Sequence, residues 1–192
     1  AMLLFLVAGA SADAAEVADS IRIPSGDWLQ SELILHLIML AKGQVGRIRN
    51  RKRPPQDRLV SGTGGERANA ALYYRLLRGV RALAFVLQGR RVRGMVDPIA
   101  VFSEVKSLAA GASDLEDTFP EGAIAVFPGP FHLASLLIAA GSALMESAVV
   151  NLPPPDGVPE DRWTEAMKTV AETRPYLWRN HKDAVAQGYL KI

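Results

Sequence analysis

The residues of this chain with the clearest chemical potential are basic. Residues 42–93 hold fourteen of the 22 Lys and Arg side chains, and only two acids, Asp57 and Glu66, so this block carries +12 while the rest of the chain carries −10. Such asymmetry indicates an acidic partner, with nucleic acid as the first candidate. The candidate phosphate-binding residues are Arg47, Arg49, Arg51, Lys52, Arg53, Arg75, Arg78, Arg81, Arg90, Arg91 and Arg93.

Arginine dominates this basic block, with twelve Arg against two Lys. The guanidinium group is a planar fork that suits phosphate and also stacks on bases. Contacts of this kind release counterions and give affinity without reading sequence. The block therefore predicts contact with the backbone of DNA or RNA.

Two other interpretations of the block remain open. It can meet an acidic protein instead of nucleic acid. It can also be neutralised within the chain, because acids gather elsewhere in the sequence; these are Asp114, Glu116, Asp117, Glu121, Glu160 and Asp161.

No complete catalytic or metal-binding motif is present. The absence of cysteine excludes disulfides and thiolate metal sites. The sequence contains no GxxxxGK[ST], GxSxG, HExxH or EF-hand pattern. Glu32 and His36 share a helix face but lack a third ligand, so His36 is expected to be a core histidine. We expect no catalytic residue, metal or cofactor in this chain.

The elements that position the arginines are expected to be helical. Thr63 and Glu66 match a capping box. After it, apolar residues follow at spacings of four, four, three and four, which is one stripe of a helix; they are Leu72, Leu76, Val80, Leu83 and Leu87. Arg75, Arg78 and Arg81 form a ridge beside this stripe.

Other helices are expected over residues 25–41, 98–110, 131–150, 159–174 and 180–187, after an apolar first helix. Val101, Val105 and Leu108 are expected to point inward. Strand signals are scarce, so the fold class is all-α, an irregular bundle of six or seven helices with little or no sheet. The expected division is a bundle over 1–150 with its basic loop and helix at 42–93, a proline-rich linker at 151–158 and a C-terminal helical pair at 159–192.

Two apolar stretches raise the question of a membrane. The run after Met2 lacks the positive start of a signal peptide, and Ala1 before it resembles a residue left by tag removal. The run over 131–150 is interrupted by polar residues and has no closely flanking Lys or Arg. Both are expected to be core helices, which predicts no membrane contact and a cytoplasmic location.

The C-terminal stretch over residues 174–190 reads RPYLWRNHKDAVAQGYL. It resembles the segment just before the first ATPase motif of superfamily 2 (DEAD/DEAH-type) helicases. Pro175, Tyr176 and Trp178 match the proline and aromatic lead of that segment. The resemblance implies that Trp178, Asn180 and His181 contribute to an adenine site, with ATP and Mg bound by the parent protein.

The resemblance covers about 17 of 192 residues, and the chain ends at Ile192, before any phosphate loop. It implies the N-terminal helical region of a helicase, cut before the first ATPase motif. This region would be a non-catalytic accessory domain that contacts the phosphate backbone, with the downstream motor as a further partner. Three alternatives remain: the aromatic residues dock the last helix on the bundle, the chain is a helical adaptor that binds an acidic protein, or it is an enzyme whose site no motif reveals.

Overall fold

The protein is an all-α bundle, as the sequence predicts. The computed structural model describes residues 1–52, 62–90, 94–111 and 126–177, and also residues 181, 183, 184 and 187. These residues contain eight α-helices and one 3-10 turn, η2 (Val149–Asn151), but no strand. An isolated antiparallel bridge joins Ala148 to Tyr176.

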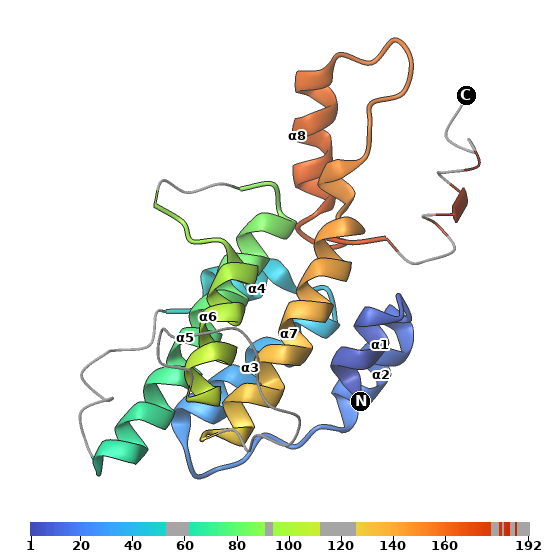
Figure 1. Ribbon diagram of the computed structural model, residues 1–192. Coiled ribbons are helices and arrows are strands. Elements are labelled where there is room, and N and C mark those ends of the chain that lie inside the picture. The colour runs from blue at the N-terminus through green and yellow to red at the C-terminus, as the bar shows by residue number, and fades with distance from the viewer. Residues whose placement is uncertain are drawn as a thin grey trace.

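Figure 1 shows the arrangement of the helices. In chain order they are α1 (Met2–Val7), α2 (Ser11–Ser20), α3 (Trp28–Ala41), α4 (Val45–Asn50), α5 (Gly64–Leu87), α6 (Pro98–Ala110), α7 (Pro128–Glu146) and α8 (Glu160–Val170). The apolar pattern of the sequence did not predict α2 or α4. Both are short, and α4 lies inside the basic block.

Helix α5 organises the bundle because it packs on α3, α4, α6 and α7. Its predicted apolar stripe is buried over its whole length. Gly79 lets α6 approach closely: a Cβ at this position would lie 2.4 Å from the ring of Phe102, which is itself fully buried. The arginines of α5 therefore stand on a rigid central element.

Local signals fix where the main helices begin. The capping box before α5 is formed, with Glu66 Oε2 accepting from the Thr63 amide at 2.7 Å and Thr63 Oγ1 accepting from the Glu66 amide at 3.3 Å. Asp27 caps α3, and Asp97 caps α6. Gly111 ends α6 with φ of 81°, a left-handed conformation that suits glycine.

Helix α7 is, within the described part of the chain, the one helix long and apolar enough to cross a membrane by length and composition, with a mean hydropathy of 1.3. It packs on α1, α5 and α6, and its Ala134, Leu137 and Ala140 are fully buried. In all, 33% of its most apolar 18-residue stretch is buried.

Helix α8 projects from the rest of the bundle (Figure 1), and none of its residues is buried. Trp163 Nε1 donates to the carbonyl of Leu152 at 2.8 Å, which ties α8 to the chain that precedes it. After α8, the hydroxyl of Tyr176 reaches the carbonyls of Leu40 at 2.8 Å and Ala41 at 3.0 Å at the end of α3. Side-chain contacts at each end therefore hold α8 to the bundle.

Candidate nucleic-acid interface

Acidic side chains from other elements pair with many of the predicted phosphate-binding arginines. Arg51 makes a two-pronged contact with Glu32, with Nε and Nη2 at 2.6 and 2.8 Å from the two carboxylate oxygens. Arg75 pairs with Glu104 of α6. Arg49 and Arg90 both pair with Glu172, as described below. Neutralisation within the chain thus accounts for part of the basic block.

A buried polar network links Arg51 to the core. His36 is fully buried, and its Nδ1–H donates to the carbonyl of Glu32 at 2.8 Å. Its Nε2 lies 3.4 Å from Nη1 of Arg81, whose Nη2 donates to the carbonyl of Arg51 at 2.9 Å. Nδ1 therefore carries the imidazole proton, and Nε2 accepts from Arg81. His36 is a core histidine, as the sequence predicts, and Arg81 is a structural contact between α5 and the end of α4.

The pKa values in this network favour a neutral histidine beside an ionised carboxylate. Burial lowers the pKa of His36, and the charges of Arg81 and Arg51 lower it further against the opposing effect of Glu32. Burial raises the pKa of Glu32, but the hydrogen bond from Arg51 and the electrostatic interactions with His36, Arg51 and Arg81 outweigh it, so the net pKa is lowered.

Within the described residues of the basic block, four basic side chains are exposed and pair with no acid in the part of the chain that the structure describes. We call them the basic track; they are Arg47, Lys52, Arg67 and Arg78. Because an α-helix turns by about 100° per residue, Arg67, Arg78 and Arg81 fall within about 60° on one side of α5. The Arg81 contact to the Arg51 carbonyl brings the end of α4, including Lys52, to this side. Arg47 lies one turn before Arg51. The two helices thus contribute to one basic surface.

This surface stays positive after the paired acids are counted. Residues 42–52 and 62–90 carry ten basic side chains and one acid, Glu66. Four further acids reach them from outside these ranges; they are Asp19, Glu32, Glu104 and Glu172. Ten basic groups against five acids leave a balance of +5, which is enough to attract a polyanion.

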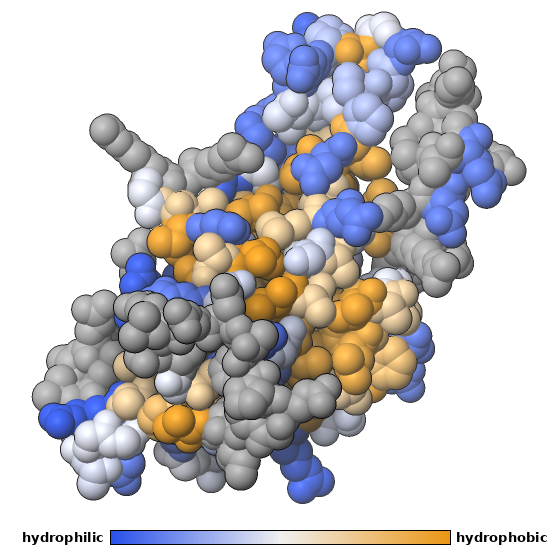
Figure 2. Space-filling view, viewed as in Figure 1, coloured by the Kyte–Doolittle hydropathy of each residue, from blue (hydrophilic) through white to orange (hydrophobic). Residues whose placement is uncertain are grey.

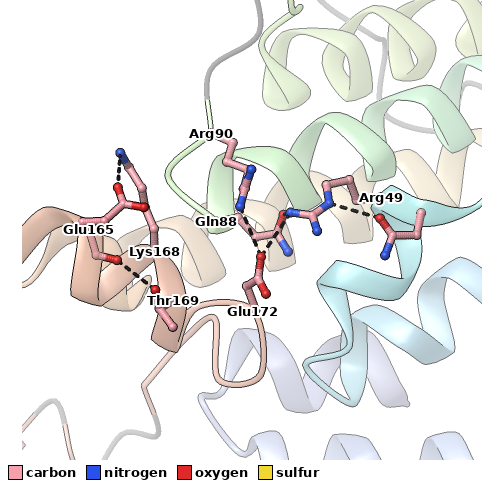
Figure 3. Close-up of polar contacts among 8 residues, drawn as sticks. Arg49, Gln88, Arg90, Glu165, Lys168, Thr169 and Glu172 are labelled. Carbon is pink, nitrogen blue, oxygen red and sulfur yellow. Dashed lines mark hydrogen bonds and ion pairs between the residues drawn. The ribbon is translucent and has the colours of Figure 1, made fainter.

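A second group of side chains, the Glu172 cluster, consists of Arg49, Gln88, Arg90 and Glu172 (Figure 3). Oε1 of Glu172 lies 3.4 Å from Nη1 of Arg49 and 3.2 Å from Nη2 of Arg90. Oε1 of the fully buried Gln88 accepts from Nη1 of Arg49 at 3.2 Å. The cluster joins α4 and the end of α5 to the turn that follows α8.

Among the remaining predicted site residues, the structure describes only His181. Arg53, Arg91, Arg93, Trp178 and Asn180 lie outside the described residues. His181 is described, and it lines a cleft of about 560 Å³ between α8, α2 and the end of α3.

This cleft is mainly apolar. Trp163, Met167 and Val170 are apolar residues of α8, and they line this cleft instead of packing in the core. Lys42 and Arg174 are among its polar residues, and its lining contains no Asp or Glu among the described residues. Figure 2 shows the outer side of α8 as mainly hydrophilic, which agrees with an amphipathic helix.

Reasoning from sequence missed the acidic partners Glu104 and Glu172, and also Gln88, because no motif or short spacing relates them to the arginines. Glu32 was considered only as a metal ligand. In the described ranges, no group of three His, Asp or Glu side chains is placed to hold a metal ion. Comparison with protein families, with curated proteins and with solved structures gave no match.

Proposed function

We propose that this chain is a non-catalytic accessory domain that contacts the phosphate backbone of nucleic acid for an ATP-dependent helicase. The observation that carries the proposal is the basic track, formed by Arg47, Lys52, Arg67 and Arg78. These four side chains are exposed, lie on or just after two helices joined by the contact between Arg81 and Arg51, and belong to a surface with a balance of +5.

The arrangement fits contact with a backbone better than recognition of bases. The track runs along the side of α5, and Arg67 and Arg78 are separated by about 16 Å at 1.5 Å per residue. Side chains spaced in this way reach separate phosphates of one strand, and such contacts position a strand without reading its sequence. DNA and RNA are both suitable ligands.

A pair of matched double variants tests this role. Arg47→Gln with Arg78→Gln removes two charges from the track. Arg22→Gln with Arg162→Gln removes two exposed charges from outside the basic block. With a labelled single strand, the track variant should reduce the magnitude of the slope of log K against log salt by about 1.4, because each lost phosphate contact contributes about 0.7. If both variants reduced the slope equally, binding would depend on the net charge of the protein and not on the basic track, which would contradict the proposal.

The helicase part of the proposal depends on the resemblance of residues 174–190. It predicts that the reading frame continues past Ile192 into a glycine-rich GKS or GKT segment, which would supply the phosphate loop. Trp178, Asn180 and His181 would then lie near the adenine of ATP, with Mg bound by the motor. A frame that stops at Ile192 would remove this part and leave backbone binding to stand alone.

The cleft beside α8 favours a second candidate function, that of a helical adaptor for an acidic protein. Its apolar lining and its cationic Lys42 and Arg174 complement an amphipathic segment that carries Leu and Glu. Met167→Glu would place a negative charge in the cleft and should abolish binding of such a peptide while leaving nucleic-acid binding intact. Binding of the peptide by the wild-type protein, with no nucleic acid bound at low salt, would favour the adaptor over the helicase domain.

A further inference from the structure

The Glu172 cluster has more donors than its carboxylate satisfies. Two guanidinium groups, from Arg49 and Arg90, converge on a single oxygen of Glu172, at 3.4 and 3.2 Å. Charge-assisted bonds of this type are normally about 2.7–2.9 Å long. The carboxylate therefore sits loosely between the two donors, and the cluster keeps one uncompensated positive charge.

Gln88, the buried member of the cluster, also has a donor that the carboxylate does not satisfy. Gln88 is fully buried, and its Nε2 has no hydrogen-bond partner, although the great majority of buried polar groups have one. A Cβ built on Gly46 would lie 3.5 Å from this Nε2 and 3.6 Å from the carbonyl oxygen of Glu172, so the unpaired amide and the main chain of Glu172 both lie close to Gly46. A third donor therefore belongs to the same cluster, since the Oε1 of this amide accepts from Arg49.

We propose that Arg49, Arg90 and the Nε2 of Gln88 form a binding site for a phosphate group, and that Glu172 occupies this site as an internal competitor. A phosphate group has three or four oxygens around one centre, so it can engage both guanidinium forks and the amide at once, which a single carboxylate oxygen does not. Gln88 Oε1 and Asn50 Oδ1 both accept from Arg49, at 3.2 and 3.3 Å, and keep its fork oriented.

This site is separate from the basic track. Arg47 and Arg49 are two residues apart on α4, so their side chains project about 200° apart around the helix. The carboxylate also has a second role, because Glu172 follows α8 directly and its two ion pairs hold the end of α8 to α4 and α5. Entry of a phosphate would displace Glu172 and loosen α8 and the segment after it.

Two sources can supply the phosphate: free inorganic phosphate or pyrophosphate, and the terminal phosphate of a nucleic-acid strand. The probes are therefore pyrophosphate, measured by calorimetry, and a short oligonucleotide with and without a 5′-phosphate. Binding of pyrophosphate without a preference for the phosphorylated strand would assign the site to free phosphate. A preference for the phosphorylated strand would assign it to strand ends, and either result supports a phosphate site.

The decisive variant is Glu172→Gln, with Glu165→Gln as the matched control. Glu165 is an exposed carboxylate of α8 whose ion-pair partner is Lys168, one turn along the same helix. Because exposed ion pairs are individually weak and two must be broken, Glu172→Gln should tighten pyrophosphate binding about tenfold, and Glu165→Gln should change it less than twofold. Unchanged affinity in Glu172→Gln would overturn the proposal that this carboxylate competes.

Variants of the donors complete the test. Gln88→Glu keeps the size of the side chain but replaces the amide donor with a negative charge, so it should abolish pyrophosphate binding. Arg90→Gln, at a side chain that is 48% exposed, should weaken binding at least tenfold without unfolding the protein. In the wild-type protein, pyrophosphate should also speed amide exchange over residues 168–174. Binding that survives Arg90→Gln, or no binding to Glu172→Gln at millimolar pyrophosphate, would refute the site.

Discussion

The attachment of α8 through Tyr176 gives the sharpest prediction about stability. Tyr176→Phe removes a hydroxyl that donates to the carbonyls of Leu40 and Ala41 at the end of α3. The Leu40 carbonyl keeps its bond from the amide of Gly43 at 3.0 Å, so Ala41 is the acceptor that loses its donor. The loss of a net hydrogen bond beside a buried carbonyl costs about 1–2 kcal/mol.

This cost should appear locally. Helix α8 has no buried residue, and only Ala171, Pro175 and Tyr176 are buried in residues 171–177, so we expect this region to open without unfolding of the bundle. Lowering the free energy of local opening by about 1–2 kcal/mol corresponds to amide exchange that is about five- to thirtyfold faster over residues 160–177. Exchange in α5 should not change. Hydrogen–deuterium exchange followed by mass spectrometry measures both regions in one experiment.

Tyr73→Phe is the matched control, because Tyr73 is half-buried and its hydroxyl makes no hydrogen bond within the described residues. It should leave exchange over residues 160–177 unchanged. If Tyr176→Phe speeds exchange equally in α5 and α8, or changes neither, then the hydroxyl does not anchor α8 in the way described.

Three further predictions concern the core. Because the pKa of buried His36 is lowered from 6.5, the unfolded chain binds a proton at a higher pH than the folded chain does. The free energy of unfolding should therefore fall by up to about 1.4 kcal/mol per pH unit as the pH drops below 6.5. His36→Gln should flatten this slope, as measured by urea titrations between about pH 6.5 and 5. Overpacking in Gly79→Ala should destabilise the protein by about 1–3 kcal/mol, and the better helix propensity of alanine should offset about 1 kcal/mol of this cost. In Gly141→Ala the closest contact of the new Cβ, at 3.0 Å, is with the end of a flexible side chain, so its urea midpoint should stay close to that of the wild type. Phe102→Ala should cost about 3–5 kcal/mol and Leu108→Ala, on the same helix but 43% exposed, less than about 1 kcal/mol, as measured by thermal unfolding.

Local signals in the sequence were sufficient for the class of fold and for most helix starts. The capping box at Thr63 and Glu66 and the caps at Asp27 and Asp97 depend on residues within a few positions of each other, so short spacing reveals them. The apolar stripe of α5 contains five residues at four successive helical spacings, which makes its period unambiguous. The short helices α2 and α4 have too few turns for a comparable pattern.

The orientation of α6 shows where local reasoning fails. The sequence predicts that Val101, Val105 and Leu108 point inward, whereas the structure buries Phe102 and Val105 and leaves Leu108 43% exposed, so the prediction for Leu108 was wrong. The reason lies on another helix, since Gly79 of α5 leaves room for the ring of Phe102. The spacing of apolar residues within one helix cannot reveal a packing contact with a residue of another helix.

The same limit applies to the candidate site. The arginines were visible as a charge block, but their acidic partners come from distant elements: Glu32 from α3, Glu104 from α6 and Glu172 from the turn after α8. These pairings divide the block into exposed and internally paired residues, which composition cannot do. Gln88 carries no sequence signal at all, because its significance depends on burial and on an unpaired amide.

The most direct test of the central claim is the salt dependence of binding between the wild-type chain and a labelled single strand. Four track residues that each neutralise one phosphate predict a slope of log K against log salt of about −3. Binding that is absent at low salt, or a slope near zero, would contradict the claim that the basic track contacts the phosphate backbone.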